Sequence, residues 1–458
     1  MALSRGKKLL FPLGQFGLVL SSYGVLRQFS DFYVSRPGSD SVFPVHLYQG
    51  YLFGLFTVAG LIIALSRIVD ACACLCAGWL SDRFSPVRGF RRTGFMAFSV
   101  LPVALFSVLV FTPPTQELYR LNSVFVLVLS LLFFVFLSLY TVPYLALLAE
   151  IGRSPRVRMQ LSTLMACATA FASLLGNRAF TFGALFSSRF GMSMEAGYRA
   201  VLAVFALLSA VCMLLPVLFL NESAETVASP VRDSFQDAVS AVFHDSHFKH
   251  YLIADILYRV SSAFIVYGFS YYVTGLLSLP QESGAFLLLV IFFANLALYI
   301  PVYVVSQRLG KRKILFIAFF MFMLFIAGGA FAGKYPISAM SQGYLFAFLL
   351  AIPLSVFSVV PNALISDLAV ASERKTGVFR SGMYFGIHGF ATRSAQLAAV
   401  VLVPLLLRIG SASEFARRAG ITGMRVTLVL AAVFSLTGFL FLFGYHEKEV
   451  SVLLEKNP

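Results

Sequence analysis

The chain has 458 residues, of which 59% are hydrophobic and only 12% are charged, and its mean hydropathy is +0.86. Soluble domains are about 45–50% apolar and about 25% charged, so this composition excludes a soluble enzyme, a disordered chain and a nucleic-acid-binding domain. The net charge of +15 does not indicate a nucleic-acid partner, because the basic residues lie in short loops between apolar runs. Charge in that position orients helices in a bilayer.

The apolar runs predict twelve membrane-spanning helices, since about 20 residues are needed to cross a bilayer. The runs are continuous and do not alternate apolar with polar residues, which excludes a membrane β-barrel. We therefore expect an all-α integral membrane protein. The predicted spans cover residues 9–34, 48–80, 93–112, 120–149, 159–187, 198–220, 250–277, 284–306, 314–332, 343–366, 381–407 and 421–445.

Twelve spans place both termini on the same side of the membrane. The loops on that side carry 21 of the 35 Lys and Arg residues, whereas the opposite loops carry 9. Because cytoplasmic loops are enriched in Lys and Arg, we expect both termini to be cytoplasmic. The expected location is the cytoplasmic membrane, either a plasma membrane or a bacterial inner membrane.

The two halves of the chain resemble each other at an offset of about 220 residues. Val142-Pro143 recurs as Val360-Pro361, each followed by an acid late in the same span, and Arg158 at the start of span five recurs as Arg380 at the start of span eleven. Parallel six-helix halves around a midplane cavity are typical of major facilitator transporters. The predicted parts are a first bundle at 1–220, a cytoplasmic linker at 221–249, a second bundle at 250–446 and a cytoplasmic tail at 447–458.

Eight charged residues fall well inside the predicted spans, away from their first five residues, where each Arg or Asp costs about 2.5–3.5 kcal/mol at the membrane centre. Six of them form three pairs at helical spacing, which lets the charges neutralise each other. The pairs are either structural ion pairs or the lining of a transport cavity. They are Arg27 with Asp31, Arg67 with Asp70, and Asp255 with Arg259.

The other two, Arg178 and Arg393, have no acidic residue one helical turn away. A guanidinium inside a span needs a counter-charge, so each is expected to face water, a distant acid or an anionic group of the substrate. For Arg178 the alternative is a side chain that reaches out to the membrane interface. The excess of Arg over Asp in the spans favours a substrate with a carboxylate or phosphate.

A second set of charges lies at the predicted cytoplasmic ends of the helices. These charges could form ion pairs between the two halves that close a cytoplasmic gate and break when the halves rock. Alternatively, they only cap helix ends and set topology. The set comprises Asp82, Arg83, Glu150, Arg158, Asp367 and Arg380.

The stretch from Arg67 to Arg83, RIVDACACLCAGWLSDR, resembles the second-helix signature of the glycoside–pentoside–hexuronide cation symporters. These form the melibiose-permease-like branch of the major facilitator superfamily, which also includes carriers of lysophospholipids. Three further segments are similar to this family and extend the resemblance over nearly the whole chain. They are Phe11–Gly17, Tyr140–Leu147 and Thr376–Gly386.

The resemblance implies a cation site made by two acids on the second helix and a hydroxyl on span four. Here the acids are reduced to Asp70, since Cys74 stands at the second position, and Ser138 supplies the hydroxyl. Sodium requires several oxygen ligands, by analogy with other hard cations, whereas a single buried carboxyl can bind and release a proton. We therefore expect proton coupling rather than sodium coupling. Thr141 stands where the family has a sugar-binding acid, and Arg393 where it has a basic residue.

The predicted function is that of a secondary active transporter, a cation-coupled symporter of a small anionic or glycoside-type solute, and not an enzyme. A lysophospholipid carrier of the same fold is the first alternative, and a non-transporting receptor or scaffold is a second. We expect no cofactor apart from the transported proton or sodium ion, and no resident metal. The expected partners are the solute, small or lipid-like, and the lipid bilayer, with a monomeric protein and no nucleic acid.

Overall fold

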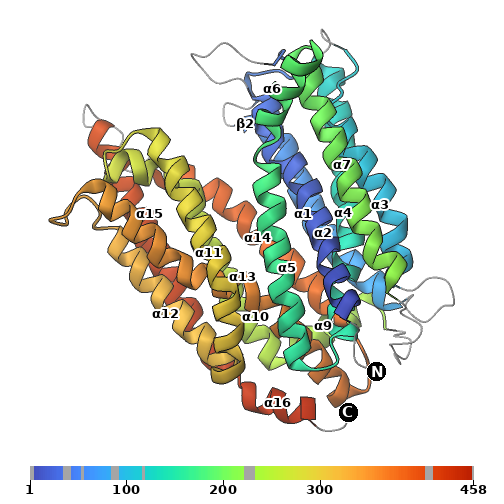
Figure 1. Ribbon diagram of the computed structural model, residues 1–458. Helices are drawn as coiled ribbons and strands as arrows, with labels where there is room; N and C mark the ends of the chain where they lie inside the picture. Colours follow the sequence, from blue (N-terminus) through green and yellow to red (C-terminus); the bar gives the residue numbers. More distant parts are fainter. Residues whose placement is uncertain are drawn as a thin grey trace. The chain divides into compact units, whose positions relative to one another are not determined.

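The computed structural model describes residues 5–34, 43–52, 56–83, 92–115, 119–220, 233–407 and 416–455. Within these residues twelve helices are long and apolar enough to cross a membrane (Figure 1). The prediction of a helical membrane protein with twelve spans is therefore confirmed. One short antiparallel hairpin, β1 (Tyr51–Leu52) and β2 (Phe56–Thr57), precedes the second span.

The chain divides into two compact units, which we describe separately. Unit 1 comprises residues 1–153, 167–233 and 378–390. Its core is formed by α1 packed on α7, α2 on α4, and α3 on both α4 and α7. Its helices are α1 (Arg5–Tyr33), α2 (Val58–Arg83), α3 (Arg92–Leu109), α4 (Tyr119–Ile151), the second half of α5 (Pro155–Gly176), α6 (Ala179–Phe190), α7 (Met194–Phe219) and the start of α14 (Ser381–Leu407).

Unit 2 comprises residues 154–166, 234–377 and 391–458. In its core α10 packs on α15, and α13 packs on α11 and α12. It contains the first half of α5, the remainder of α14, and α9 (Phe235–His244), α10 (Ser246–Tyr271), the π-turn η1 (Tyr272–Leu276), α11 (Gln281–Leu309), α12 (Lys311–Gly329), α13 (Ala339–Thr376), α15 (Ala416–Phe441), the 3₁₀ turn η2 (Leu442–Gly444) and α16 (Glu447–Glu455).

Helix α2 shows how the sequence selects the buried face of a span. Its buried positions recur every fourth residue, and the intervening positions include large apolar residues such as Ile68, which is 46% exposed. Membrane helices pack through small and polar residues, because large apolar side chains gain nothing by leaving lipid. The buried row places Asp70 inside unit 1. It consists of Ile62, Ser66, Asp70, Cys74 and Gly78.

The prediction of a single fifth span at 159–187 is wrong. Helix α5 ends at Gly176, a turn follows, and the separate helix α6 begins at Ala179 (Figure 1). Gly176 packs against the ring of Tyr23, and Arg178 at the start of α6 is exposed and does not lie within a span. The apolar run continues through this turn, so hydropathy alone could not detect it.

Two further boundaries differ from the prediction. Helix α2 begins at Val58, and residues 48–57 instead include the β-hairpin. Helix α13 continues to Thr376, so Asp367 lies inside the helix and not at its end. Glu373, Arg374 and Lys375 are good helix formers, and the two cations suit the last turn. Gly377 ends the helix in a left-handed conformation.

The predicted linker contains a helix. Ser234 caps α9 and Asp245 caps α10, which therefore starts four residues before the predicted span. Residues 221–232 of the linker and 456–458 of the tail lie outside the described residues. The described part of the tail forms α16.

Helices α2 and α14 approach closely at three glycines within unit 1. A Cβ on Gly78 would lie 2.6 Å from the carbonyl oxygen of Gly382, and a Cβ on Gly386 would lie 2.7 Å from that of Cys74. Backbone atoms cannot move aside as a flexible side chain can. The first two turns of α14 are therefore fixed against the helix that carries Asp70.

We predict that Gly386→Val lowers the free energy of unfolding by about 1–3 kcal/mol, because the added methyl groups overpack this contact. The control is Gly24→Ala on α1, where a Cβ meets no atom within 4 Å. Thermal unfolding in detergent measures both variants. A Gly386→Val protein as stable as the wild type would contradict the described packing.

Candidate functional site

The predicted coupling residues meet at the α2–α4 interface of unit 1. Asp70 is 0% exposed, and the Ser138 hydroxyl donates a hydrogen bond of 2.7 Å to its Oδ1. The Cys74 Sγ lies 3.3 Å from the Ser138 Oγ. Because the single hydroxyl proton of Ser138 points to Asp70, the Cys74 thiol is the donor in that contact. The structure thus brings all three residues together.

Arg67 completes this group. Its Nη1 donates to Asp70 Oδ2 over 3.0 Å, which is the ion pair expected at a spacing of three residues. The Arg67 side chain is 23% exposed, whereas the carboxylate is fully buried. The ring of Phe134 on α4 lies 5.6 Å from the guanidinium carbon. The carboxylate is therefore held by a hydroxyl on one oxygen and a cation on the other.

Unit 2 contains a comparable pair on α10. Arg259 Nε lies 3.3 Å from Asp255 Oδ2, and the acid is 2% exposed. The guanidinium lies over the ring of Tyr258, at 5.9 Å. As in unit 1, the acid is buried and the arginine remains partly exposed at 28%.

The other predicted substrate-binding residues are placed as follows. Arg27 is exposed on α1 and Asp31, one turn later, is half-buried. The Thr141 hydroxyl on α4 donates to the Leu137 carbonyl over 2.7 Å. Arg393 is half-buried on the part of α14 that belongs to unit 2, and Arg178 lies outside the spans, as described above.

The predicted gate acids of unit 1 are joined by Arg92, the first residue of α3. The Arg92 guanidinium is 1% exposed, and it contacts Asp82 Oδ1 at 2.8 Å and Glu150 Oε1 at 2.6 Å. Asp82 also accepts hydrogen bonds from the backbone N–H groups of Gly382 and Met383, at 2.8 and 2.7 Å. Asp82 thus caps the positive N-terminus of α14.

The corresponding cluster in unit 2 is centred on Asp367. Arg158 Nε in the first turn of α5 donates to Asp367 Oδ1 over 2.5 Å, and Lys311, the first residue of α12, pairs with Oδ2. The neighbouring Ser162 hydroxyl donates to the Val359 carbonyl. A helix from the first half of the sequence is thereby anchored to α13, within unit 2.

The last two predicted gate residues make different contacts. Arg380, just before α14, forms two hydrogen bonds to Asp233 Oδ2, at 2.8 and 2.6 Å. The Trp79 indole N–H donates to the Asp233 carbonyl over 3.3 Å. Arg83 is exposed, and its guanidinium lies 4.9 Å from the Trp79 ring.

Sequence reasoning missed four partners of these charges: Arg92, Lys311, Asp233 and Glu447. Glu447 of α16 accepts the backbone N–H groups of Lys311 and Arg312, at 2.7 and 2.9 Å. Arg92 and Lys311 were predicted only as basic loop residues. Both begin a helix, however, and a cation at the start of a helix is unfavourable unless acids lie nearby. A cation at the start of a predicted helix was therefore the sequence signal that could have indicated a nearby acid.

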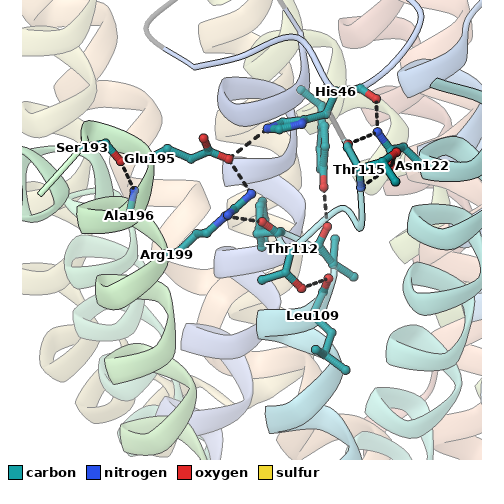
Figure 2. Close-up of polar contacts among 12 residues, drawn as sticks. His46, Leu109, Thr112, Thr115, Asn122, Ser193, Glu195, Ala196 and Arg199 are labelled. Atoms are coloured by element: carbon teal, nitrogen blue, oxygen red, sulfur yellow. Dashed lines mark hydrogen bonds and ion pairs between the residues drawn. The ribbon is translucent and has the colours of Figure 1, made fainter. Parts of the chain in front are cut away.

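A further polar cluster lies at the other end of unit 1, where α1 ends. Figure 2 shows His46 and Arg199 both pointing toward Glu195: His46 Nε2 lies 2.9 Å from its Oε1, and Arg199 pairs with the same oxygen. Arg199 also donates to the Phe111 carbonyl, and Asn122 donates to the His46 carbonyl. The cluster fixes the segment after α1 to α7. Glu195 and Arg199 lie four residues apart on α7, at helical spacing. No spacing in the sequence indicates His46 and Asn122, because both are far from α7 along the chain.

Comparison with known protein families identifies the family of this chain. The model of the MFS/sugar transport protein family matches residues 52–449. The chain belongs to this family, which is that of the melibiose-permease-like glycoside–pentoside–hexuronide symporters. It is therefore a multi-pass membrane protein of a transporter family and not of an enzyme family. No curated protein sequence matches the chain.

Solved structures of major facilitator transporters share the fold. The E. coli fucose:proton symporter FucP has a TM-score of 0.63 at 15% identity, with 94% of this chain and 98% of that chain covered. The proton:xylose symporter XylE has a TM-score of 0.61 at 13% identity, with 98% of both chains covered. A bacterial homologue of the iron transporter ferroportin has a TM-score of 0.66 at 14% identity, with 97% and 99% covered. At these identities the likeness shows the fold alone.

We predict that Arg92→Gln lowers the free energy of unfolding by about 3–5 kcal/mol, because it leaves two buried carboxylates without their shared cation. The exposed Arg83→Gln is the matched control and should change stability by less than about 0.5 kcal/mol. Chemical unfolding in detergent measures both. The double variant Arg92→Gln/Glu150→Gln should recover part of the loss, and an Arg92→Gln protein of wild-type stability would contradict the cluster.

Proposed function

We propose that this chain is a proton-coupled symporter that moves a small solute, anionic or of the glycoside type, across the cytoplasmic membrane by alternating access, with both termini in the cytoplasm. The observation that carries the proposal is the fully buried carboxylate of Asp70, held by Ser138 and Arg67. An ionisable group inside a membrane protein is costly, and it is a functional-site candidate for that reason.

The surroundings of Asp70 favour a proton over sodium as the coupling ion. A metal cation at the carboxylate would lie beside the Arg67 guanidinium, which is 3.0 Å from Oδ2 and carries the same charge. Ser138 supplies one further oxygen and Cys74 a sulfur, which is a poor ligand for a hard cation. In the part of the chain that the structure describes, no group of three or more His, Cys, Asp and Glu could hold a metal.

Proton binding at Asp70 would change its contacts in a defined way. The neutral carboxyl no longer attracts Arg67, so the guanidinium becomes available to an anionic group on the solute. Loss of the proton restores the ion pair and displaces the solute. Since a ligand shifts a conformational equilibrium only by binding one state better, this exchange of partners at Arg67 supplies the coupling between proton and solute.

The ion-pair clusters around Asp82 and Asp367 form the cytoplasmic gate in this proposal. Asp82 holds the first turn of α14, and Asp367 holds the first turn of α5. Alternating access requires the helix ends at one face to separate and meet again. We assign the opening and closing of the cytoplasmic gate to the breaking and reforming of these contacts, together with those of Arg380.

The solute class is narrowed by the charges in the spans. Arg67 and Arg259 are paired yet partly exposed, and Arg393 is half-buried on α14. Guanidinium groups bind carboxylates and phosphates through two parallel hydrogen bonds. The family model is one of sugar transport, and two structural neighbours are proton symporters for fucose and xylose by their titles. A sugar acid satisfies both sets of observations.

We predict that D-glucuronate raises the melting temperature of the purified monomer more than the neutral sugars D-xylose and melibiose do, with a larger rise at about pH 5.5 than at about pH 7.5. Lysophosphatidylcholine is included as the lipid alternative. A rise with lysophosphatidylcholine alone would reverse the assignment in favour of a lysolipid carrier.

We predict that Asp70→Asn abolishes solute accumulation driven by a proton gradient in proteoliposomes, a loss of at least about tenfold. Exchange between equal solute concentrations on both sides should persist within about threefold, because Asn resembles the protonated acid. Asp237→Asn, on the exposed face of α9, is the control.

Asp70→Asn also leaves Arg67 without its carboxylate, so the double variant Asp70→Asn/Arg67→Gln is measured beside it. Accumulation that survives in both variants would remove Asp70 from the coupling mechanism.

A further inference from the structure

Unit 1 contains a small, partly open cavity that the proposed coupling mechanism does not use. It lies among α1, α2 and α4, and the space between its lining atoms is about 220 Å³, including the part that is open to the surroundings. Its walls are apolar apart from two serines. Valine, leucine, isoleucine and phenylalanine side chains line it together with Ser66 of α2 and Ser130 of α4.

The two serine hydroxyls are unusual in their surroundings. Ser66 is 1% exposed and Ser130 is 2% exposed, and neither Oγ has a hydrogen-bond partner among the described residues. Serines in membrane helices readily donate to a carbonyl of the preceding turn, as Ser99 does to Phe95 over 2.8 Å. A buried hydroxyl without a partner is unfavourable. These two therefore point to a polar occupant of the cavity.

The cavity lies next to the coupling carboxylate. Ser66 precedes Asp70 by one turn on the buried row of α2, and Ser130 precedes Ser138 by two turns on α4, which is about 6 Å and about 12 Å along the helix axes. Phe134 lies between Ser130 and Ser138 on α4. It lines the cavity, is 2% exposed and contacts Arg67 with its ring. Phe134 thus separates the cavity from the ion pair.

The size and chemistry of the cavity limit what can occupy it. The part that the centre of a water molecule can reach is about 10 Å³, enough for a single water at one time. A hydroxyl both donates and accepts a hydrogen bond, so two hydroxyls and a water can pass a proton along. Two hydroxyl oxygens in an otherwise apolar wall are too few for a sodium ion. The occupant that fits is water.

We propose that the Ser66–Ser130 cavity is the route by which a proton reaches Asp70 from the membrane face on which α2 begins, with Phe134 as the barrier that blocks leakage. A hydronium ion at that face gives its proton to the water and hydroxyls of the cavity, and the last donor transfers it to an oxygen of Asp70, where a carboxyl O–H forms and the bond to Arg67 breaks. The inference rests on the proposed protonation of Asp70.

The first test measures hydration of the cavity and needs no solute. Ser66→Cys and Ser130→Cys proteins in lipid nanodiscs are treated with 2-aminoethyl methanethiosulfonate, and each peptide is read by mass spectrometry, so that the native cysteines can remain. Ser99→Cys on α3 is the matched control, since Ser99 is likewise buried, at 0% exposed, but its hydroxyl already donates to the Phe95 carbonyl. We expect both cavity thiols to react at least about tenfold faster than the control. Equal rates at all three positions would overturn the proposal.

The second test measures the barrier. In proteoliposomes with an internal pH dye and an imposed potassium diffusion potential, Phe134→Ala should leak protons at least about tenfold faster than the wild type. Adding Ser66→Ala and Ser130→Ala, or adding Asp70→Asn, should remove the leak. Phe98→Ala, at a position that is 66% exposed on α3, is the control.

The outcomes separate the inference from the proposed function. A proton leak of Phe134→Ala that persists after Asp70→Asn is added shows a path that bypasses the carboxylate, and it overturns the inference. A Phe134→Ala protein that leaks no faster than the wild type, together with unreactive thiols in Ser66→Cys and Ser130→Cys, also overturns it. Conversely, reactive thiols together with proton-driven accumulation that survives Asp70→Asn would leave the hydrated cavity in place and overturn the coupling role of Asp70.

Discussion

A buried carboxylate in a membrane protein must be neutralised, and the centre of unit 1 is arranged around this constraint. Asp70 lies on the buried face of α2, among small and polar residues, and the packing of α2 on α4 leaves it 0% exposed. One of its oxygens is satisfied by a hydroxyl and the other by a guanidinium. A proton can replace the guanidinium as the neutralising charge, and this choice between two partners is the physical basis of the proposed coupling.

The same chemistry recurs at the ends of several helices. Asp82 accepts the first N–H groups of α14, and Glu447 accepts those of α12. Asp367 binds the first-turn arginine of α5. In each case an acid meets the positive end of a helix or a cation within its first turn, where it is most favourable. In the proposed gate, contacts of this kind define the closed state, and they can break without unfolding a helix.

The fold was predictable because hydropathy reports the one property that a span must have. Length and apolar content identify the twelve spans, although the start of α2 and the end of α13 differ from the prediction by ten residues each. The run at 159–187 concealed the turn at Asn177 and Arg178. A turn near the membrane interface leaves no gap in hydropathy. The short hairpin before α2 was missed for the same reason, because its residues are apolar too.

The candidate site was predictable only where its partners lie on one helix. The pairs Arg67–Asp70 and Asp255–Arg259 follow from helical spacing and are in contact. The position of Ser138 came from the family resemblance, since no spacing joins it to Asp70. Arg92, Lys311, Asp233 and the contact of His46 with Glu195 depend on packing between distant segments, which one sequence does not encode in any local pattern.

The central claim is that Asp70 takes up and releases a proton. Infrared difference spectroscopy of the protein in lipid films tests it most directly, by following the C=O stretch of protonated carboxyl groups as the pH is lowered. The account predicts a band in the wild type that is missing in Asp70→Asn and that shifts in Ser138→Ala, because the serine hydrogen bond is lost. Identical difference spectra for the wild type and Asp70→Asn across the pH range of transport would contradict it.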